Sequence, residues 1–190
     1  MSNIWFSSDL HFGHDREFVW AVRGFKSVNE MNSAIVSNWD SIVQPEDTVY
    51  LLGDIMLGDN EIGMNWLKQL TGNIKIILGN HDTNKRIAFY KENGYEILGY
   101  GMPLKISNQR FFLSHYPTMT SNLEKSSNLK EHVINLYGHT HQKTNFYNGM
   151  PFMYHVGVDS HNCTPINLET IIEDIKKEAE KCITYIKDEW

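Results

Sequence analysis

The chain is poor in features that mark whole classes of protein. Its two cysteines, Cys163 and Cys182, form no C-x-x-C pair and are too few for a disulfide framework, so we expect both thiols to be reduced. No apolar run approaches the length that spans a bilayer. Residues 1–5 lack the basic start and the apolar stretch of a signal peptide. We therefore expect a cytoplasmic protein without membrane contact.

Basic residues are also scarce. The sequence holds 17 lysines and arginines against 23 acidic residues, a formal net charge of -6, and no block of lysines or arginines stands out. Nothing therefore marks a surface for duplex nucleic acid. An acidic protein can still bind phosphate groups through bound cations, which dominate their local field. The length of 190 residues, with no linker or repeat, predicts one domain over residues 1–190.

Strand-like and helix-like segments alternate in the first half. Short apolar runs predict strands at residues 4–6, 49–52 and 74–78. A capping box at Ser27 and Glu30 predicts the start of a helix with apolar residues at helical spacing. A second helix is expected to turn Ile62, Trp66 and Leu70 inward and to stop at Gly72, and a third to stop near residues 93–94.

The second half is richer in strands. Residues 104–106 and 111–113 predict a hairpin, residues 134–137 a strand, and Asn148-Gly149 a tight turn before a strand that Pro151 assigns to a sheet edge. The last helix carries an apolar stripe that starts at Leu168. The polar residues 120–130 predict a loop or a short helix that could select the substrate. This order predicts an α/β fold, a four-layer α/β/β/α sandwich of two mixed sheets with helices on the outer faces.

Polar clusters follow five of the strand-like runs. They are Asp9-Leu10-His11, Gly53-Asp54, Gly79-Asn80-His81-Asp82, His115 and Gly138-His139-Thr140-His141. Asp and Asn are also common at strand ends because they form local turns, but the shared position favours one site beyond the carboxyl ends of the strands. Carboxylate, carboxamide and imidazole groups bind divalent transition metals, and the absence of thiolates argues against structural zinc. The clusters predict a metal-assisted hydrolase.

In this order and spacing the clusters resemble the motifs of the calcineurin-like metallophosphoesterase superfamily, in its small bacterial and phage-type branch. The resemblance covers almost the whole chain and implies two divalent metal ions. The first would be held by Asp9, His11, Asp54 and His141. The second would be held by Asp54, Asn80, His115 and His139, with Asp54 bridging the pair. The ligand types favour Mn²⁺, with Fe, Zn²⁺, Ni²⁺ and Co²⁺ as alternatives.

The resemblance also implies a reaction, in which a metal-bridging hydroxide attacks a phosphomonoester or a phosphodiester. His81 would be catalytic, stabilising the developing charge or protonating the leaving oxygen. Asp82 is also assigned as catalytic, and it would orient either the loop or the His81 imidazole. Substrate binding is assigned to Asn80, His81 and His14, although His14 could instead cap the following helix. The expected partner is a small phosphate ester, with nucleotides among the candidates.

Some residues stay outside this assignment. Arg16 and Arg23 are interpreted as surface arginines, with phosphate binding as the alternative. Asp159 and Asn162 are interpreted as residues that shape the site from behind the ligands, and His132 and His155 as structural. His161 has no interpretation. Gly53-Asp54 is followed by no arginine, unlike the motif of calcineurin-type protein phosphatases, which argues against protein phosphatase activity.

Two other functions remain open. One is a nuclease or nucleic-acid-end phosphatase of the same fold, which would require a basic strip near the site. The other is a non-catalytic metal-binding scaffold, as in a retromer subunit of the superfamily, but that subunit lacks the histidine that this chain retains at His81. The sequence leaves the native metal, the substrate and the oligomeric state open.

Overall fold

The structure is a computed structural model that describes residues 2–120 and 129–188, with side chains described up to residue 181. Its strands form two five-stranded sheets. The first contains, in spatial order, β10 (Ile166–Asn167), β1 (Ile4–Ser7), β2 (Thr48–Leu52), β3 (Asn73–Ile77) and β4 (Glu96–Gly99). The strands β1 to β4 are parallel, and β10 pairs antiparallel with β1.

The second sheet is also mixed. It contains, in spatial order, β5 (Gly101–Ile106), β6 (Gln109–Ser114), β7 (Val133–Tyr137), β9 (Met150–His155) and β8 (Phe146–Tyr147). The strands β6, β7 and β9 are parallel, whereas β5 and β8 pair antiparallel with their neighbours. Five helices and one 3-10 turn complete the described chain: α1 (Glu17–Trp20), α2 (Val28–Asp40), α3 (Asn60–Leu67), α4 (Asn84–Glu92), η1 (Leu129–Glu131) and α5 (Leu168–Asp188).

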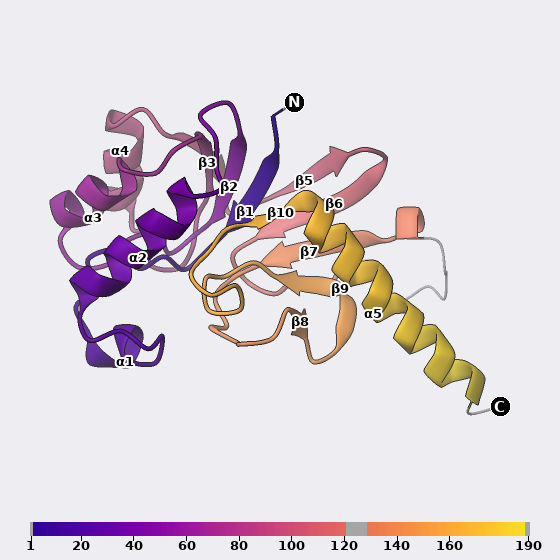
Figure 1. The fold of residues 1–190 in the computed structure, drawn as a ribbon. Coiled ribbons are helices and arrows are strands. Elements are labelled where there is room, and N and C mark those ends of the chain that lie inside the picture. The colour runs from indigo at the N-terminus through magenta and orange to yellow at the C-terminus, as the bar shows by residue number, and fades with distance from the viewer. Residues whose placement is uncertain (1, 121–128, 189–190) are drawn as a thin grey trace.

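One core lies between the first sheet and its helices, which gather on the side away from the second sheet (Figure 1). In α2, Met31, Ile35 and Trp39 recur at helical spacing and are fully buried. They belong to the same cluster as Val49 and Leu51 of β2. As predicted, the Ser27 side chain caps this helix by accepting a hydrogen bond from the Glu30 amide at 3.2 Å.

A second core lies between the two sheets. Its members from the first sheet include Phe6, Leu52 and Ile77, and those from the second include Leu113 and Leu136. Alternation along each strand gives every sheet one face for this core. The predicted α/β sandwich of two mixed sheets is therefore confirmed.

The helix α5 runs along β9 and reaches the same inter-sheet core (Figure 1). It contributes Ile171 and Ile175, which are fully buried. Asp174, on the same helix, accepts a hydrogen bond from the Tyr154 hydroxyl at 2.7 Å. The predicted apolar stripe thus starts as expected, while its members from Cys182 onward lie outside the described side chains. None of the helices described is both long and apolar enough to cross a lipid bilayer.

Several local expectations are wrong. The strands β4 and β10 were not predicted, and the helix expected after His14 was given no bounds, because each is too short to show a period. Pro151 lies in β9, which has a neighbouring strand on each side and is therefore not an edge strand. The proline is tolerated because it precedes the part of β9 that forms hydrogen bonds with β7. The helix α3 ends at Leu67, before Gly72, and Ile62 is 53% exposed. Most of the 120–130 segment lies outside the described residues.

The topology fixes where the site forms. Because β1, β2 and β3 are parallel, Asp9, Asp54 and Asn80 emerge at one edge of the first sheet. Likewise β6 and β7 are parallel, so that His115 and His139 emerge together at the corresponding edge of the second. A bridge between Ser8 and Gly157 joins the two edges.

Candidate metal centre and active site

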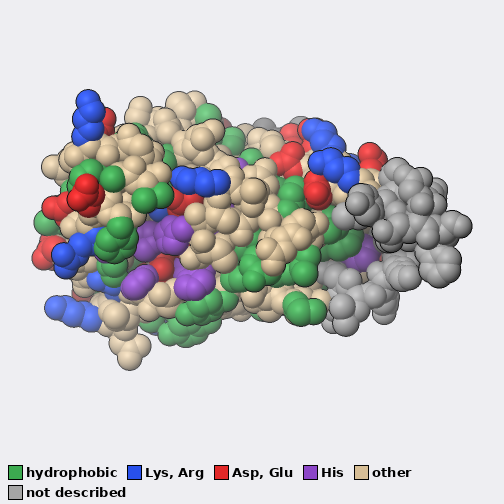
Figure 2. All heavy atoms as spheres, turned by 90° about the horizontal axis from the view of Figure 1, so that it is seen from below, with side chains coloured by type: hydrophobic (Ala, Val, Ile, Leu, Met, Phe, Trp, Pro, Cys, Tyr) green, Lys and Arg blue, Asp and Glu red, His purple; other side chains and the backbone are tan. Residues whose placement is uncertain are grey.

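All seven residues predicted as metal ligands converge at this edge. Two overlapping groups of side chains offer ligand atoms within 4.8 Å of one another: Asp9 with His11 and His141, and Asp9 with Asp54 and His115. Asn80 and His139 adjoin the second group. Histidine side chains gather there on the molecular surface, with hydrophobic side chains around them (Figure 2).

The loops reach this geometry through an unusual backbone. Asp9, His11, Asp54, His139 and His141 all have positive φ, between 49° and 67°. Non-glycine residues rarely adopt this left-handed conformation, and such strain concentrates at functional sites.

Two glycines let the ligand loops approach closely. A Cβ on Gly53 would lie 2.5 Å from the Gly79 nitrogen and 2.8 Å from the His115 Nδ1. A Cβ on Gly138 would lie 2.5 Å from the Asp9 Oδ2. No side chain fits at either position, so both glycines are needed for packing, and Gly53 is also needed for its positive φ of 84°.

Asp54 is the most central acidic group. Its Oδ1 accepts a hydrogen bond from the His81 amide at 2.9 Å, and its Oδ2 lies 3.4 Å from the His115 Nε2 and 4.0 Å from the His11 Nε2. Burial would raise its pKa, but the hydrogen bond and charge of His115 and the His81 amide outweigh burial and lower the pKa to about 2. Asp54 is therefore a carboxylate at neutral pH.

Asp9 and His11 carry buried polar atoms without hydrogen-bond partners. The Asp9 Oδ2 accepts bonds from the Ser8 hydroxyl at 2.6 Å and the His139 amide at 2.9 Å, whereas its Oδ1 has none. Both ring nitrogens of His11 are also buried and unpartnered. Burial raises the pKa of Asp9 and lowers that of His11 well below its usual range. Such orphaned atoms are costly alone, and a cation between them would satisfy them.

Asn80, His115 and His139 form a second convergent set. The Asn80 Oδ1 lies 2.9 Å from the His115 Nε2 and 3.0 Å from the His139 Nδ1. The His115 Nδ1 lies 2.8 Å from the Leu52 carbonyl oxygen, which can only accept, so Nδ1 carries a proton and Nε2 is the ring atom that faces the site. The three converging atoms suit a transition-metal ion, in agreement with the donor types.

Behind His141 lies a buried ion pair. The Asp159 Oδ2 accepts a hydrogen bond from the His141 Nδ1 at 2.8 Å, which leaves the His141 Nε2 facing Asp9 at 3.9 Å. Arg23 binds both oxygens of Asp159, at 3.0 and 2.9 Å, and donates to the Asp9 carbonyl oxygen at 2.8 Å. The Arg23 side chain is only 2% exposed, so its interpretation as a surface arginine is wrong. No motif marks it, because its partner lies 136 residues away.

Asp82 contacts the loop backbone. Its Oδ2 accepts hydrogen bonds from the Gly79 amide at 2.8 Å and the Asp54 amide at 3.2 Å, and its Oδ1 accepts one from the Tyr90 hydroxyl at 2.8 Å. Burial raises the pKa of Asp82. The carboxylate thus joins the loops after β2 and β3. Arg86, also missed in the sequence, donates a short hydrogen bond to the His81 carbonyl oxygen.

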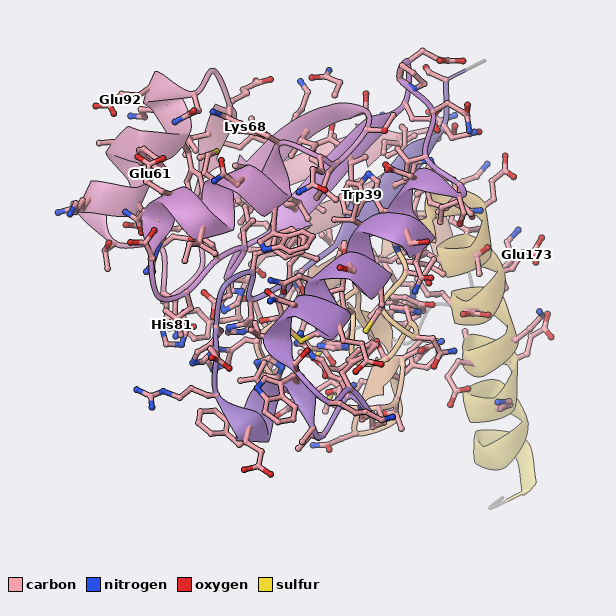
Figure 3. All side chains as sticks on the ribbon, turned by 60° about the vertical axis from the view of Figure 1, so that its left-hand side comes forward. Trp39, Glu61, Lys68, His81, Glu92 and Glu173 are labelled. Atoms are coloured by element: carbon pink, nitrogen blue, oxygen red, sulfur yellow. The ribbon has the colours of Figure 1, made fainter. Side chains whose placement is uncertain are left out.

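His81 and His14 are at the open side. The His81 side chain is 43% exposed, and its Nε2 lies 3.8 Å from the Asp54 Oδ2. In Figure 3 it lies below α3, the helix that carries the labelled Glu61. The His14 ring stacks on His11, with centroids 5.4 Å apart. The N-cap of α1 is Arg16, so the interpretation of His14 as a helix cap is wrong.

Other histidines are structural, as expected for His155. Its Nδ1 lies 2.8 Å from the Ser160 Oγ, and burial lowers its pKa to about 3. The His161 Nε2 lies 2.8 Å from the His155 carbonyl oxygen, and its ring stacks on Tyr154. Through these contacts His161 packs against the strand β9. Cys163 is a buried free thiol, as predicted.

Comparison with known proteins agrees with the architecture. Residues 3–177 match the model of the calcineurin-like phosphoesterase superfamily domain. The uncharacterized protein MJ1445 of Methanocaldococcus jannaschii is 30% identical over 186 residues, 93% of each chain. The Gene 66 protein of Mycobacterium phage D29 is 29% identical over 210 residues, 93% of this chain and 99% of that protein. The crystal structure of AQ665, a protein of unknown function from Aquifex aeolicus, superposes with a TM-score of 0.68 at 25% identity over 91% of this chain and 99% of that one. The chain belongs to the calcineurin-like phosphoesterase superfamily and is a hydrolase of phosphoester bonds, with aspartate and histidine groups that could hold metal.

Proposed function

We propose that the protein is a dinuclear-metal phosphohydrolase that cleaves a small phosphomonoester or phosphodiester. The observation that carries the proposal is the pair of ligand groups that overlap at Asp9, with Asp54 within 4.0 Å of histidines from both. When bound, two ions would supply Lewis acidity to the phosphoryl group and to the attacking water.

The ligand roles follow the two convergent sets. Asp9, His11 and His141 would hold the first ion, and Asn80, His115 and His139 the second. Asp54 would serve both, because it is ionised and lies between the sets. Asp9 also belongs to both geometric groups, but one of its oxygens is already held by Ser8 and the His139 amide. The donor set of imidazole and oxygen ligands favours Mn²⁺, with Fe, Zn²⁺, Ni²⁺ or Co²⁺ as alternatives.

The chain's own chemistry centres on His81. Its ring is half-exposed beside Asp54, where a phosphate bound between the two ligand sets would lie. A protonated His81 would stabilise charge on a phosphoryl oxygen or give its proton to the leaving oxygen. We assign Asp82 a positioning role, because its hydrogen bonds hold the loops that carry Asp54 and His81. His14, stacked on His11, would contact the substrate.

The test is a substrate panel with metal analysis of the same protein sample. The panel combines aryl phosphate mono- and diesters, nucleotides, and single-stranded DNA and RNA with Mn²⁺, Co²⁺, Ni²⁺ or Zn²⁺. We expect turnover of small esters and two metal equivalents per chain. The absence of turnover with every metal would contradict the hydrolase mechanism, and a preference for polynucleotides would favour a nuclease.

Asp54→Asn provides the sharpest control. The variant keeps the size of the side chain but loses the charge between the ligand sets, so it should weaken binding of both metals and abolish turnover. Asp59→Asn is its matched control, because Asp59 caps α3 at the surface. If Asp54→Asn still bound two metals and retained normal activity, Asp54 would not be the bridge.

A further inference from the structure

Most of the large exposed hydrophobic side chains among the described residues lie in segments that follow the carboxyl ends of the strands, the edge that carries the metal site. Six large ones belong to segments attached to its edge: Phe18, Val22, Ile62, Tyr100, Tyr116 and Met119. Among the residues that the structure describes, Met150, the first residue of β9, is the one large hydrophobic side chain exposed at the opposite edge. Single exposed apolar residues are ordinary, but a concentration at one site indicates a binding surface.

Phe18 stands on the side of the first ligand set. Its ring is 70% exposed and meets the His14 ring edge to face, with centroids 5.7 Å apart. His14 in turn stacks on His11. Three rings therefore lead from the surface to a metal ligand. Ile62 adjoins this row, since its Cγ2 lies 3.5 Å from the position of a Cβ on Gly13.

Tyr116 stands on the side of the second ligand set. It is 51% exposed, and its ring lies 4.5 Å from the His139 ring and 5.4 Å from the His115 ring, both at steep angles. The backbone of the Tyr116 turn is held by the Ser114 hydroxyl, which donates to its carbonyl oxygen at 2.8 Å. The ring thus lies beside two of the proposed metal ligands.

The position of these rings limits what can touch them. A phosphate held by the ligand sets places the organic part of its ester one oxygen away from phosphorus, between the first and second ligand sets. An exposed ring lies next to each set: Phe18 meets the His14 ring on the first side, and Tyr116 meets the His139 ring on the second. Aromatic walls favour flat aromatic groups, because rings stack in offset or edge-to-face geometry. Stacking tolerates any base, since every base has a π-face.

We propose that Phe18 and Tyr116 are specificity-determining walls that select phosphate esters carrying an aromatic group, nucleosides above all. The inference rests on the proposed function, because the phosphate is placed by the metal site. It goes beyond that function by naming the organic half of the substrate and the residues that recognise it.

The first measurement is a selectivity ratio. Thymidine 5′-monophosphate and 2-deoxyribose 5-phosphate share a primary-alcohol leaving group and a charge but differ in the aromatic base, so the ratio of their kcat/KM values reports contacts to the base. We expect the Mn²⁺-loaded protein to prefer the nucleoside ester, and Phe18→Ala or Tyr116→Ala to reduce the ratio by about 5- to 150-fold, the range of base–aromatic stacking. Tyr116→Phe should keep it, and so should Met150→Ala at the opposite edge.

The second measurement does not need turnover. Phenylphosphonate and methylphosphonate carry stable C–P bonds, and their binding to the metal-loaded protein is compared by calorimetry. A tighter binding of phenylphosphonate that both alanine variants abolish supports the walls, even where no ester is hydrolysed and the proposed function fails. Turnover without any aromatic preference, or a preference that neither variant alters, overturns the walls and leaves the proposed function intact.

Self-association is the remaining outcome. If the wild-type protein is a dimer by light scattering and Phe18→Ala or Tyr116→Ala makes it monomeric, the exposed rings form a subunit interface. That result would also overturn the inference.

Discussion

Arg23→Lys should lower both the free energy of unfolding and the affinity for metal, because the Arg23 guanidinium bonds to residues that support the metal site. Arg23 makes two hydrogen bonds to Asp159, one to the Asp9 carbonyl oxygen and one to the Leu10 carbonyl oxygen. A lysine keeps the charge but has one nitrogen, which cannot reproduce the planar fork. Bonds to charged groups contribute about 1.5–3 kcal/mol each, and two or more are lost with partial compensation. We expect the free energy of unfolding to fall by about 2–4 kcal/mol.

The second effect is on metal affinity. Without a fixed Asp159, the His141 ring loses the contact that orients its Nε2, and such outer contacts are worth about 10- to 100-fold in affinity. Urea denaturation of EDTA-treated protein measures the first effect, and competition with a metallochromic chelator measures the second. Arg16→Lys, at an exposed position, is the matched control. The same denaturation midpoint and the same affinity for both ions as wild type would refute the reasoning.

Three further changes test other parts of the site. His81→Ala should keep both metals and slow turnover by ~10²–10⁴-fold, the range for general acid catalysis, and loss of a metal would instead make His81 a ligand. Tyr90→Phe removes the hydroxyl that donates to Asp82 and should lower the free energy of unfolding by about 1–3 kcal/mol, with an unchanged urea midpoint as the contrary result. His155 is neutral in the fold, with a pKa near 3 against 6.5 when unfolded. Below pH 6.5 the unfolded state therefore binds one more proton than the folded state does. The stability that neutral His155 contributes to the fold then falls by about 1.4 kcal/mol per pH unit down to pH 3. His155→Gln should make the pH dependence of unfolding shallower between pH 6 and pH 4, and an identical slope in both proteins would contradict the assignment.

The convergence of the site could be predicted from the sequence because it depends on strand direction alone. Once β1, β2 and β3 are parallel, whatever follows them must meet at one edge, and the same holds for β6 and β7. Each of these strands is an apolar run that a pattern search detects. The positive φ values of Asp9 and Asp54 were not predictable in this way, because they follow from three-dimensional packing.

The supporting residues behind the site could not be found from patterns. Tyr90 contacts Asp82 within one short segment, but nothing distinguishes it from a core tyrosine until its hydroxyl is placed 2.8 Å from the carboxylate. Arg23 lies in an irregular loop, and its ion pair with Asp159 spans most of the chain. Long-range pairs of this kind leave no periodic signal in the sequence. Arg23 was therefore expected at the surface, where most arginines lie.

The error at α3 shows how one glycine changes which face of a helix is buried. Ile62 and Trp66 have the spacing of an inward face, yet Gly63, Met64 and Leu67 are the buried residues. A Cβ on Gly63 would lie 2.6 Å from the Cβ of Met56, so the helix approaches the Met56 segment along its glycine. That close approach turns Ile62 outward, toward Gly13 at the mouth of the site. Gly63→Ala should therefore force α3 away from Met56 and disturb the approach to His11 without touching any proposed ligand, which separates the shape of the site from its metal chemistry.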